Sequence, residues 1–173
     1  MRGKLMSRSV GIVIISDRVS SEQREDLCLP LFNSILADTA FDVRETMITS
    51  DEPNRIKSVL EELIRKKLNL ILTCGGTGCG RRDNTPEVTR ALLDKPTPGL
   101  DEAIRQFSRD KARFVMYSRG VSGVAGKSYI VNLPGSPKAV SEILPFLLPT
   151  IEHPLKLIAG QIKDCAMGTE SND

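Results

Sequence analysis

The chain is poor in the residues that build metal and membrane sites. It has a single histidine, His153, and four cysteines, no two of which form a C-x-x-C pair. This pattern argues against a structural zinc site and predicts reduced thiols. No apolar run approaches the ~20 residues that cross a bilayer, and residues 1–7 lack the apolar segment of a secretory signal. We therefore expect a cytoplasmic protein without a membrane partner.

Neither sign of charge dominates the chain. It carries 24 Lys+Arg against 22 Asp+Glu, so bulk electrostatics predicts no nucleic-acid partner. A length of 173 residues suits one domain with a substantial core. We expect that domain over residues 1–160, followed by a frayed tail over residues 161–173 that has lost helical periodicity.

Two common nucleotide-binding motifs are also missing. A G-x-G-x-x-G pattern begun at Gly76 meets Arg81 where its last glycine is required. A Walker A loop begun at Gly75 needs lysine where Arg81 stands, and the other candidate loop needs glycine where Val121 stands. The sequence therefore supports neither a Rossmann nor a P-loop nucleotide site.

The chain does contain apolar β-branched runs that alternate with amphipathic segments. Strands are expected over residues 10–15, 41–48, 70–73, 114–117 and 128–132, and helices over 27–36, 53–67, 86–93, 101–107 and from 137 onward. This order predicts right-handed βαβ units, and thus a three-layer α/β/α sandwich with a mainly parallel sheet. The alternating run 41–48 belongs near a sheet edge, and Pro145 should kink or divide the last helix.

The stretch richest in chemistry is a glycine-rich loop after residues 70–73. Its glycines can present backbone N–H groups to an anion, since they tolerate positive φ and close approach. Thr85 is predicted to be the N-cap of the next helix and Pro86 its first residue, which aims the positive helix end at the same loop. On composition alone, an ordinary flexible crossover loop explains the stretch about equally well.

Three aspartates follow three separate strands. In parallel sheets, ligands bind beyond the carboxyl ends of the strands, so Asp17, Asp51 and Asp83 should gather on one edge. There Mg²⁺ can bridge carboxylates and phosphate oxygens. A helix-capping duty is favoured for Asp17 and stays open for Asp51. Asp83 is predicted to be functional, because Thr85 already supplies the cap.

Several cationic and reactive side chains have two readings. Arg81 and Arg82 suit phosphate, although at least one is expected to be an ordinary solvated charge. Lys138 lies in the first turn of the helix that Ser136 begins, against the helix dipole, which indicates an anion nearby or a solvated lysine. His153 is expected at a surface or an interface. The cysteines have no base nearby in sequence, and Cys74 and Cys79 are expected to be packing or loop residues.

Taken together, these motifs resemble the molybdopterin adenylyltransferases, a family that includes the bacterial Mog proteins and the G domains of gephyrin and its plant counterpart. The similarity runs from about residue 10 to 158. Its matching segments are residues 15–21, 50–52, 75–78, 82–87, 98–99, 118–119 and 132–138. The chain departs at residues 26–29, Asp-Leu-Cys-Leu where many relatives have Asp-x-Ser-Gly, and at Cys74, where many have threonine.

The resemblance implies a MoaB/Mog-type fold, a homotrimer, and transfer of AMP from Mg-ATP to the terminal phosphate of molybdopterin with release of pyrophosphate. A molybdenum insertase would receive the product. It implies that Asp51 and Asp83 are catalytic and hold Mg²⁺. The nucleotide and its phosphates are assigned to Gly75, Gly76, Thr77, Gly78, Arg82 and Thr85. Molybdopterin is assigned to Ser16, Asp17, Ser118, Arg119, Asn132, Pro134, Gly135, Ser136 and Lys138.

Two other readings stay open beside the enzyme. A non-catalytic, Moa-type molybdopterin-binding paralogue would keep the glycine loop without turning over ATP. The presence of residues 82–87 together with Asp51 favours turnover. A scaffold module, as in the gephyrin fusion, is expected to need a second domain or a long linker, and the 173 residues show neither.

Overall fold

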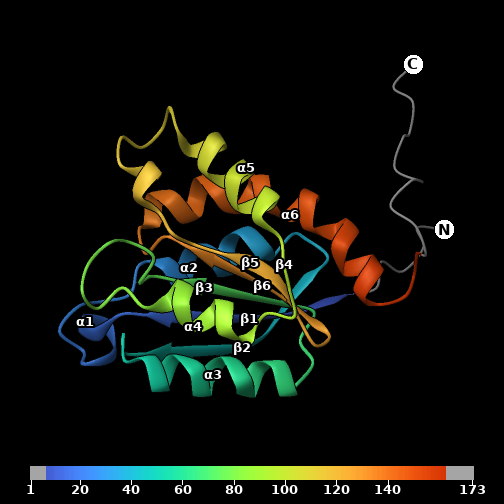
Figure 1. Cartoon of the computed structure of the whole chain (residues 1–173), viewed down its shortest axis with the longest axis horizontal. Coiled ribbons are helices and arrows are strands. Elements are labelled where there is room, and N and C mark those ends of the chain that lie inside the picture. The colour runs from blue at the N-terminus through green and yellow to red at the C-terminus, as the bar shows by residue number, and fades with distance from the viewer. Residues whose placement is uncertain (1–6, 163–173) are drawn as a thin grey trace.

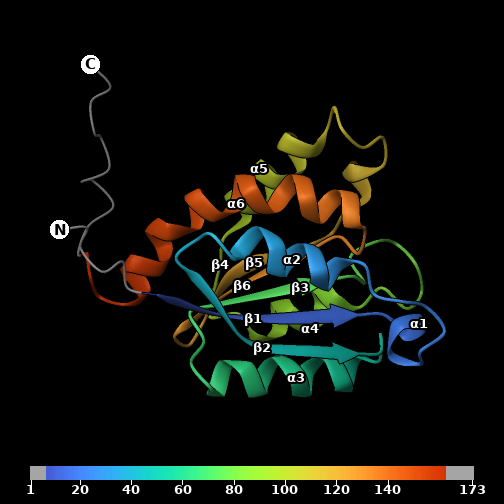
Figure 2. The same ribbon diagram turned by 180° about the vertical axis from the view of Figure 1, so that it is seen from behind.

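A six-stranded sheet forms the centre of the protein, with helices on both faces (Figures 1 and 2). The computed structural model describes residues 7–162. Its strands are β1 (Arg8–Ile15), β2 (Phe41–Thr49), β3 (Leu70–Cys74), β4 (Lys95–Pro96), β5 (Ser122–Ala125) and β6 (Ser128–Leu133). Its helices are α1 (Asp17–Ser20), α2 (Cys28–Leu36), α3 (Pro53–Arg65), α4 (Thr85–Leu92), α5 (Pro98–Ser108), the 3₁₀ turn η1 (Val115–Tyr117) and α6 (Pro137–Ile158).

The sheet has the order β2-β1-β3-β6-β5-β4. The pairs β1–β2, β1–β3 and β3–β6 are parallel, whereas β5 runs antiparallel to β6 and β4. Alternate residues of the central strands point to opposite faces, so Ile12 and Leu72 pack under α2 and α6 while Val13 and Ile71 pack against α3. Figures 1 and 2 show α2, α5 and α6 on one side of the sheet and α3 and α4 on the other. The three-layer, mainly parallel fold expected from the sequence is confirmed.

Burial explains why the four longest strands were visible in the sequence. The central strands β1, β3 and β6 are buried along almost their whole length, which gives continuous apolar runs. β2 alternates between buried or half-buried and exposed positions and lies at the sheet edge, as its pattern indicated. β4 and β5 were missed, because two and four residues are too few for a period to show.

The prediction of a strand over residues 114–117 is wrong. Residues Val115–Tyr117 form a 3₁₀ turn instead. The apolar side chains of Phe114, Met116 and Tyr117 are 69%, 67% and 58% exposed, so the run reflects a surface rather than a sheet. The polar stretch over residues 18–26 also differs from expectation, because the short helix α1 (Asp17–Ser20) covers its start and was not predicted.

Pro145 does not divide the last helix. α6 runs continuously for 22 residues with Pro145, Pro149 and Pro154 inside it. An internal proline costs a helix ~3 kcal/mol. Val140, Leu147 and Ile151 belong to a buried stripe of α6 that packs on the sheet both before and after Pro145. This packing offsets the cost of the proline.

The carboxyl ends of β1, β2, β3 and β6 meet at one edge, because these strands run parallel. The polar loops that follow them therefore converge there, as expected. Across residues 7–162, no helix combines the length and the apolar character needed to span a bilayer. Most of the expected frayed tail, residues 163–173, lies outside the described residues.

Candidate functional site

The glycine loop after β3 has a backbone that only glycine adopts easily. Gly75 has φ +116° and Gly76 has φ +62°. A Cβ atom on Gly75 would lie 2.1 Å from the carbonyl oxygen of Ile15, and one on Gly76 would lie 2.3 Å from Oγ1 of Thr85. The Gly75 N–H donates to the carbonyl of Leu133 at 3.0 Å, which joins the loop to the end of β6. The glycine loop is thus a turn of defined conformation rather than a flexible crossover loop.

Replacing Gly75 with alanine should therefore destabilise the fold. We expect Gly75→Ala to lose at least ~1–3 kcal/mol of unfolding free energy, the scale of a strained backbone position. Gly99→Ala is the matched control, because a Cβ there meets no atom within 4 Å and Gly99 lies in the first turn of α5. Thermal melting of both variants checks this. Equal shifts would show that the Gly75 turn relaxes without cost.

Arg119 holds the rest of the loop in place. Its backbone N–H donates to Thr77 O at 2.9 Å, its Nε to Gly78 O at 2.7 Å and its Nη2 to Asp83 O at 2.6 Å. The same guanidinium pairs with Glu87 on α4. The sequence assigned Arg119 to the substrate, but the structure places its donors on the loop backbone. Its geometric effect is to fix where Asp83 lies.

We expect Arg119→Lys to loosen this loop without unfolding the protein, because a lysine ammonium cannot reproduce the planar fork. Amide hydrogen exchange at Gly80 and Asp83 should become faster by roughly tenfold. The control is Arg113→Lys, on the exposed η1 side of the protein. Unchanged exchange in the loop would mean that backbone hydrogen bonds alone hold it.

Asp17, Asp51 and Arg82 join the loops after β1, β2 and β3. The Asp17 N–H donates to Asp51 Oδ2 at 2.8 Å, and the Asp51 N–H donates to Asp17 Oδ1 at 3.0 Å. Arg82 donates from Nε and Nη2 to both Asp17 oxygens at 2.9 Å, and from Nη1 to Glu52 at 3.1 Å. The expected capping duty of Asp17 is wrong: Ser16 caps α1, through the Val19 N–H. Asp17 instead anchors Arg82.

Asp17 and Asp51 sit in opposite electrostatic surroundings. The hydrogen bond from Arg82 lowers the pKa of Asp17. Burial raises the pKa of Asp51, and the nearby charges of Asp17 and Asp83 add to that rise. The surroundings of Asp51 thus disfavour its charged form. A carboxylate in this state is suited to a cation supplied with a ligand.

Asp51 and Asp83 each use one oxygen within the protein. Asp51 Oδ2 accepts from Asp17, and Asp83 Oδ2 accepts from the Gly80 N–H at 2.7 Å. In residues 7–162, Oδ1 of each carboxylate has no hydrogen-bond donor. Within the same residues no group of three or more His, Cys, Asp or Glu could hold a metal. Mg²⁺ typically takes one or two carboxylates and completes its shell with water and substrate oxygens, so this donor set fits it.

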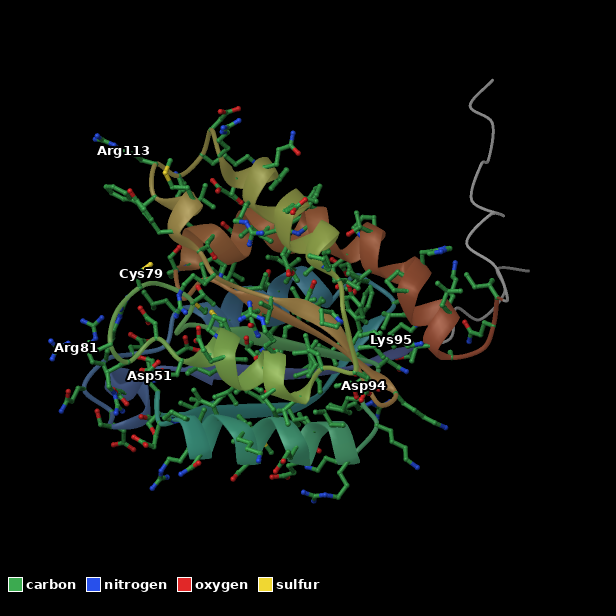
Figure 3. All side chains as sticks on the ribbon, in the orientation of Figure 1. Asp51, Cys79, Arg81, Asp94, Lys95 and Arg113 are labelled. Atoms are coloured by element: carbon green, nitrogen blue, oxygen red, sulfur yellow. The ribbon has the colours of Figure 1, made fainter. Side chains whose placement is uncertain are left out.

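These loops enclose a cavity of about 350 Å³, which we call the acidic cavity. It lies at the carboxyl edge of the sheet, where Figure 3 labels Asp51 and Arg81. In Figure 3, Asp94 and Lys95 lie toward the other end of the sheet. The acidic cavity is lined by residues of the loops after β1, β2 and β3, among them Ser16, Asp17, Asp51, Gly75, Gly76 and Asp83. The cavity therefore combines the positive-φ turn with both carboxylates that keep an oxygen available.

A second cavity of about 400 Å³, the aromatic cavity, lies on the other side of the glycine loop. Phe114 and Tyr117 line it, together with Ser118 and Lys138. The Lys138 Nζ donates to Lys111 O at 3.2 Å. Thr77, Gly78, Pro134 and Ser136 complete this wall. Sequence reasoning missed both aromatic residues by reading them as a strand, although Tyr117 directly precedes the Ser118–Arg119 motif.

The predicted cap at Ser136 is confirmed. Its Oγ accepts from the Ala139 N–H at 3.1 Å, and Pro137 is the first residue of α6. The predicted cap at Thr85 is wrong. Thr85 is the first residue of α4, and its N–H donates to Gly76 O at 3.2 Å, which draws the side chain under the glycine loop. Its Oγ1 is buried without a hydrogen-bond partner among the described residues.

Asn132 lines neither of these two cavities. Its Nδ2 donates to Oγ1 of Thr73 at 2.9 Å and of Thr89 at 3.0 Å, and its Oδ1 accepts from the Val121 N–H at 3.3 Å. The buried amide therefore joins β6 to β3 and α4. Gly135, by contrast, lies against the glycine loop and lines the acidic cavity: a Cβ on it would lie 3.0 Å from the Gly75 Cα.

Known proteins share this fold. The crystal structure of the molybdopterin biosynthesis enzyme MoaB from Thermus thermophilus superposes with a TM-score of 0.83 at 44% identity, covering 88% of this chain and 97% of that one. The Mog protein of Mycobacterium ulcerans gives a TM-score of 0.82 at 38% identity, covering 88% and 99%.

Curated relatives agree with the structural neighbours. The molybdenum cofactor biosynthesis bifunctional protein of Synechococcus elongatus is 36% identical over 91% of this chain, which spans 50% of that protein. The chain spans 26% of the Drosophila melanogaster protein cinnamon, at 36% identity over 90% of the chain. The molybdopterin adenylyltransferase of Helicobacter pylori J99 is 34% identical, over 87% of this chain and 88% of that protein.

A family model covers most of the domain. The model described as "Probable molybdopterin binding domain" matches residues 11–153, which extend from β1 into α6 and include every loop of both cavities. The matched span and the relatives above agree with the resemblance seen in the motifs. The chain belongs to the molybdopterin-binding domain family.

Proposed function

We propose that this chain is a molybdopterin adenylyltransferase, which transfers AMP from Mg-ATP to the terminal phosphate of molybdopterin and releases pyrophosphate. The observation that carries the proposal is the single glycine loop between two unlike cavities, one lined by carboxylates and one by aromatic rings. A transfer between two bound substrates requires such adjacent sites. Relatives from Escherichia coli and Haemophilus influenzae, 39% and 38% identical over 78% of this chain, are named molybdopterin adenylyltransferase.

The acidic cavity is the site we assign to Mg-ATP. Asp51 Oδ1 and Asp83 Oδ1 would hold the Mg²⁺, which neutralises phosphate charge when bound. Within residues 7–162, the N–H groups of Gly76, Thr77 and Gly78 make no hydrogen bond, so they remain as donors for phosphate oxygens. Arg82 is already paired with Asp17 and Glu52, which leaves it the secondary duty of holding the carboxylate loops together.

The aromatic cavity is the site we assign to molybdopterin. Phe114 and Tyr117 offer ring faces to a flat pterin. The N-terminus of α6, beginning after Ser136, offers a positive dipole end to the terminal phosphate. The attacking phosphate oxygen and the α-phosphorus of ATP would meet across Gly76–Gly78. Nucleotidyl transfer of this kind depends on positioning and charge neutralisation, so it requires no cysteine or histidine nucleophile.

The assay is incubation with molybdopterin and Mg-ATP, with mass spectrometry of the pterin product. An adenylylated pterin and stoichiometric pyrophosphate are the expected result. Pterin binding without product, under conditions where a known enzyme forms it, would favour the non-catalytic paralogue of this fold.

We also propose a homotrimer located in the cytoplasm that passes its product to a molybdenum insertase. Light scattering should then give about three times 19.0 kDa, and a mass near 19.0 kDa would contradict the trimer.

Ser136→Asp should separate the two ligands. Aspartate caps helices as well as serine does, so α6 should keep its first turn, while the added charge repels a phosphate at that helix end. We expect molybdopterin affinity to fall by roughly tenfold or more and Mg-ATP affinity to change little. Ser141→Asp, on the exposed surface of α6, is the control. Equal losses for both ligands would count against the assignment of the aromatic cavity.

A further inference from the structure

A single carboxylate lines the aromatic cavity. Of the described residues in its wall, Glu142 on α6 is the only acidic one. Its side chain is 28% exposed, and the ion-pair partner it has within residues 7–162, Lys138 Nζ, lies 4.0 Å away, too far for a hydrogen bond. Lys138 Nζ donates instead to Lys111 O at 3.2 Å. The Glu142 carboxylate is therefore available to a ligand.

A buried hydroxyl lines the same cavity. Ser108, the last residue of α5, is 4% exposed, and its Oγ has no hydrogen-bond partner among the described residues. Buried hydroxyls in proteins are almost always hydrogen-bonded, because leaving one without a partner costs folding free energy. A serine hydroxyl can donate or accept. The ring-face and phosphate contacts assigned above use neither Ser108 nor Glu142, so both polar groups lack an explanation.

Glu142 lies away from the end of the cavity that we assign to the phosphate. It follows the Ser136 cap by six positions on α6, which is about 9 Å along the helix axis at ~1.5 Å per residue. A carboxylate next to a phosphate would repel it, so Glu142 suits the opposite end of an elongated ligand. The rings of Phe114 and Tyr117 line the same cavity and can cover the faces of a flat ring system.

Building on the function proposed above, we propose that Glu142 and Ser108 recognise the aminopyrimidinone edge of the pterin and so decide which heterocycle the aromatic cavity accepts. That edge carries two N–H donors side by side, the ring N3–H and the 2-amino group, next to the carbonyl oxygen at C4. The Glu142 carboxylate accepts from both donors, in the paired arrangement that makes charge-assisted hydrogen bonds strong. The Ser108 hydroxyl donates to the C4 carbonyl oxygen and gains the partner it lacks.

The same edge separates the two substrates. Adenine has one amino donor beside a ring nitrogen that only accepts, and this nitrogen would face the Glu142 carboxylate without a proton between them. The adenine of ATP is therefore disfavoured in the aromatic cavity, which stays open to the pterin. Guanine carries the same pair of N–H donors as a pterin, so guanine nucleotides should compete for this cavity.

Two ligands that differ only at this edge test the proposal in the full chain without ATP. 6-Hydroxymethylpterin carries the 2-amino group, and 6-hydroxymethyllumazine carries an oxygen in its place. Fluorescence titration should show roughly tenfold to a hundredfold tighter binding of the pterin, the scale of one hydrogen bond to a charged group. GMP should displace the bound pterin at lower concentration than AMP does. Equal affinities for pterin and lumazine, or stronger displacement by AMP, would overturn the proposal.

Glu142→Gln keeps the size of the side chain and removes its charge. We expect it to weaken pterin binding by at least ~10-fold and to erase the preference for pterin over lumazine. The matched control is Glu152→Gln, which removes the same charge from the same helix, beside Lys156 and outside the wall of the aromatic cavity. Unchanged affinity and preference in Glu142→Gln would remove Glu142 from the recognition site.

Ser108→Ala separates recognition from folding. Because the Ser108 Oγ lacks a partner in the described residues, its removal should leave the melting temperature unchanged or higher. Pterin affinity should fall by about threefold to tenfold, the scale of a neutral hydrogen bond. A lower melting temperature with unchanged pterin affinity would assign the hydroxyl to the fold and overturn its role in recognition.

These binding measurements and the adenylylation assay can fail separately. Pterin binding that depends on Glu142, without any adenylylated product, would contradict the transferase and keep the recognition of the pterin edge. Product formation by a chain that binds lumazine as tightly as pterin would keep the transferase and contradict the recognition.

Discussion

Asp83→Asn should reduce adenylylation by ~10²–10³-fold, the scale of losing one preorganised electrostatic contact. The change removes the charge that a metal ion requires from Asp83 Oδ1. The amide oxygen can still accept the Gly80 N–H, which Asp83 Oδ2 accepts at 2.7 Å, and Arg119 still holds the Asp83 carbonyl. The loop should therefore keep its shape. Thermal melting, molybdopterin binding and turnover are measured on one preparation.

The control for this variant is Asp38→Asn, which removes an exposed charge just beyond the end of α2. It should leave all three measurements unchanged. Molybdopterin affinity should persist in Asp83→Asn, because Asp83 lines the acidic cavity and not the aromatic one. Turnover near the wild-type value would remove Asp83 from the metal site. A loss that tracks a lowered melting temperature would instead make the residue structural.

Asp83 is not set apart by a cap at Thr85, which the sequence predicted, because the Thr85 side chain does not cap α4. Asp83 in fact supports its own loop through Gly80. What keeps Asp83 a candidate is the second oxygen and the position beside Asp51, and neither is visible in a linear pattern.

The fold could be predicted because the sequence patterns that specify its strands and turns each lie within a short segment of the chain. Continuous apolar runs for β1, β3 and β6 follow from burial on both faces, and glycine and proline positions mark the turns between elements. The parallel order then places four loops at one edge. The glycine turn itself was predictable for the same reason, since Gly75 and Gly76 need positive φ within the segment.

The contacts within the site could not be predicted, because they join residues far apart in sequence. Arg119 reaches Gly78 across 41 positions, and Arg82 reaches Asp17 across 65. Arginine is a residue type that often binds ligands, yet each of these two arginines donates its hydrogen bonds to other residues of the protein. Asn132 is similar, with its side-chain amide bonded to Thr73 of β3, Thr89 of α4 and the backbone N–H of Val121. Residue type indicates which hydrogen bonds are available but not which are already satisfied.

Asp51→Asn should strongly reduce turnover while making the protein more stable at neutral pH. Burial raises the pKa of Asp51, so its ionisation costs folding free energy. A group with a raised folded pKa contributes stability that is present in acid and is lost as the pH rises through that pKa. Asparagine removes the ionisation and can still accept the Asp17 N–H, which Asp51 Oδ2 accepts at 2.8 Å. A site residue that the fold tolerates only at a cost is one that function maintains.

The melting difference between Asp51→Asn and wild type therefore has a defined pH dependence. The variant should melt higher than wild type in neutral buffer, and the difference should vanish in acid, where Asp51 is protonated in both the folded and unfolded states. Adenylylation should fall by ~10²–10³-fold at neutral pH, since Asp51 Oδ1 would no longer carry charge for the metal. Asp17→Asn is the matched comparison, because Arg82 lowers the pKa of Asp17 and its loss should destabilise the protein at neutral pH. If Asp51→Asn also melts lower than wild type there, the Asp51 carboxylate stabilises the loops rather than straining them.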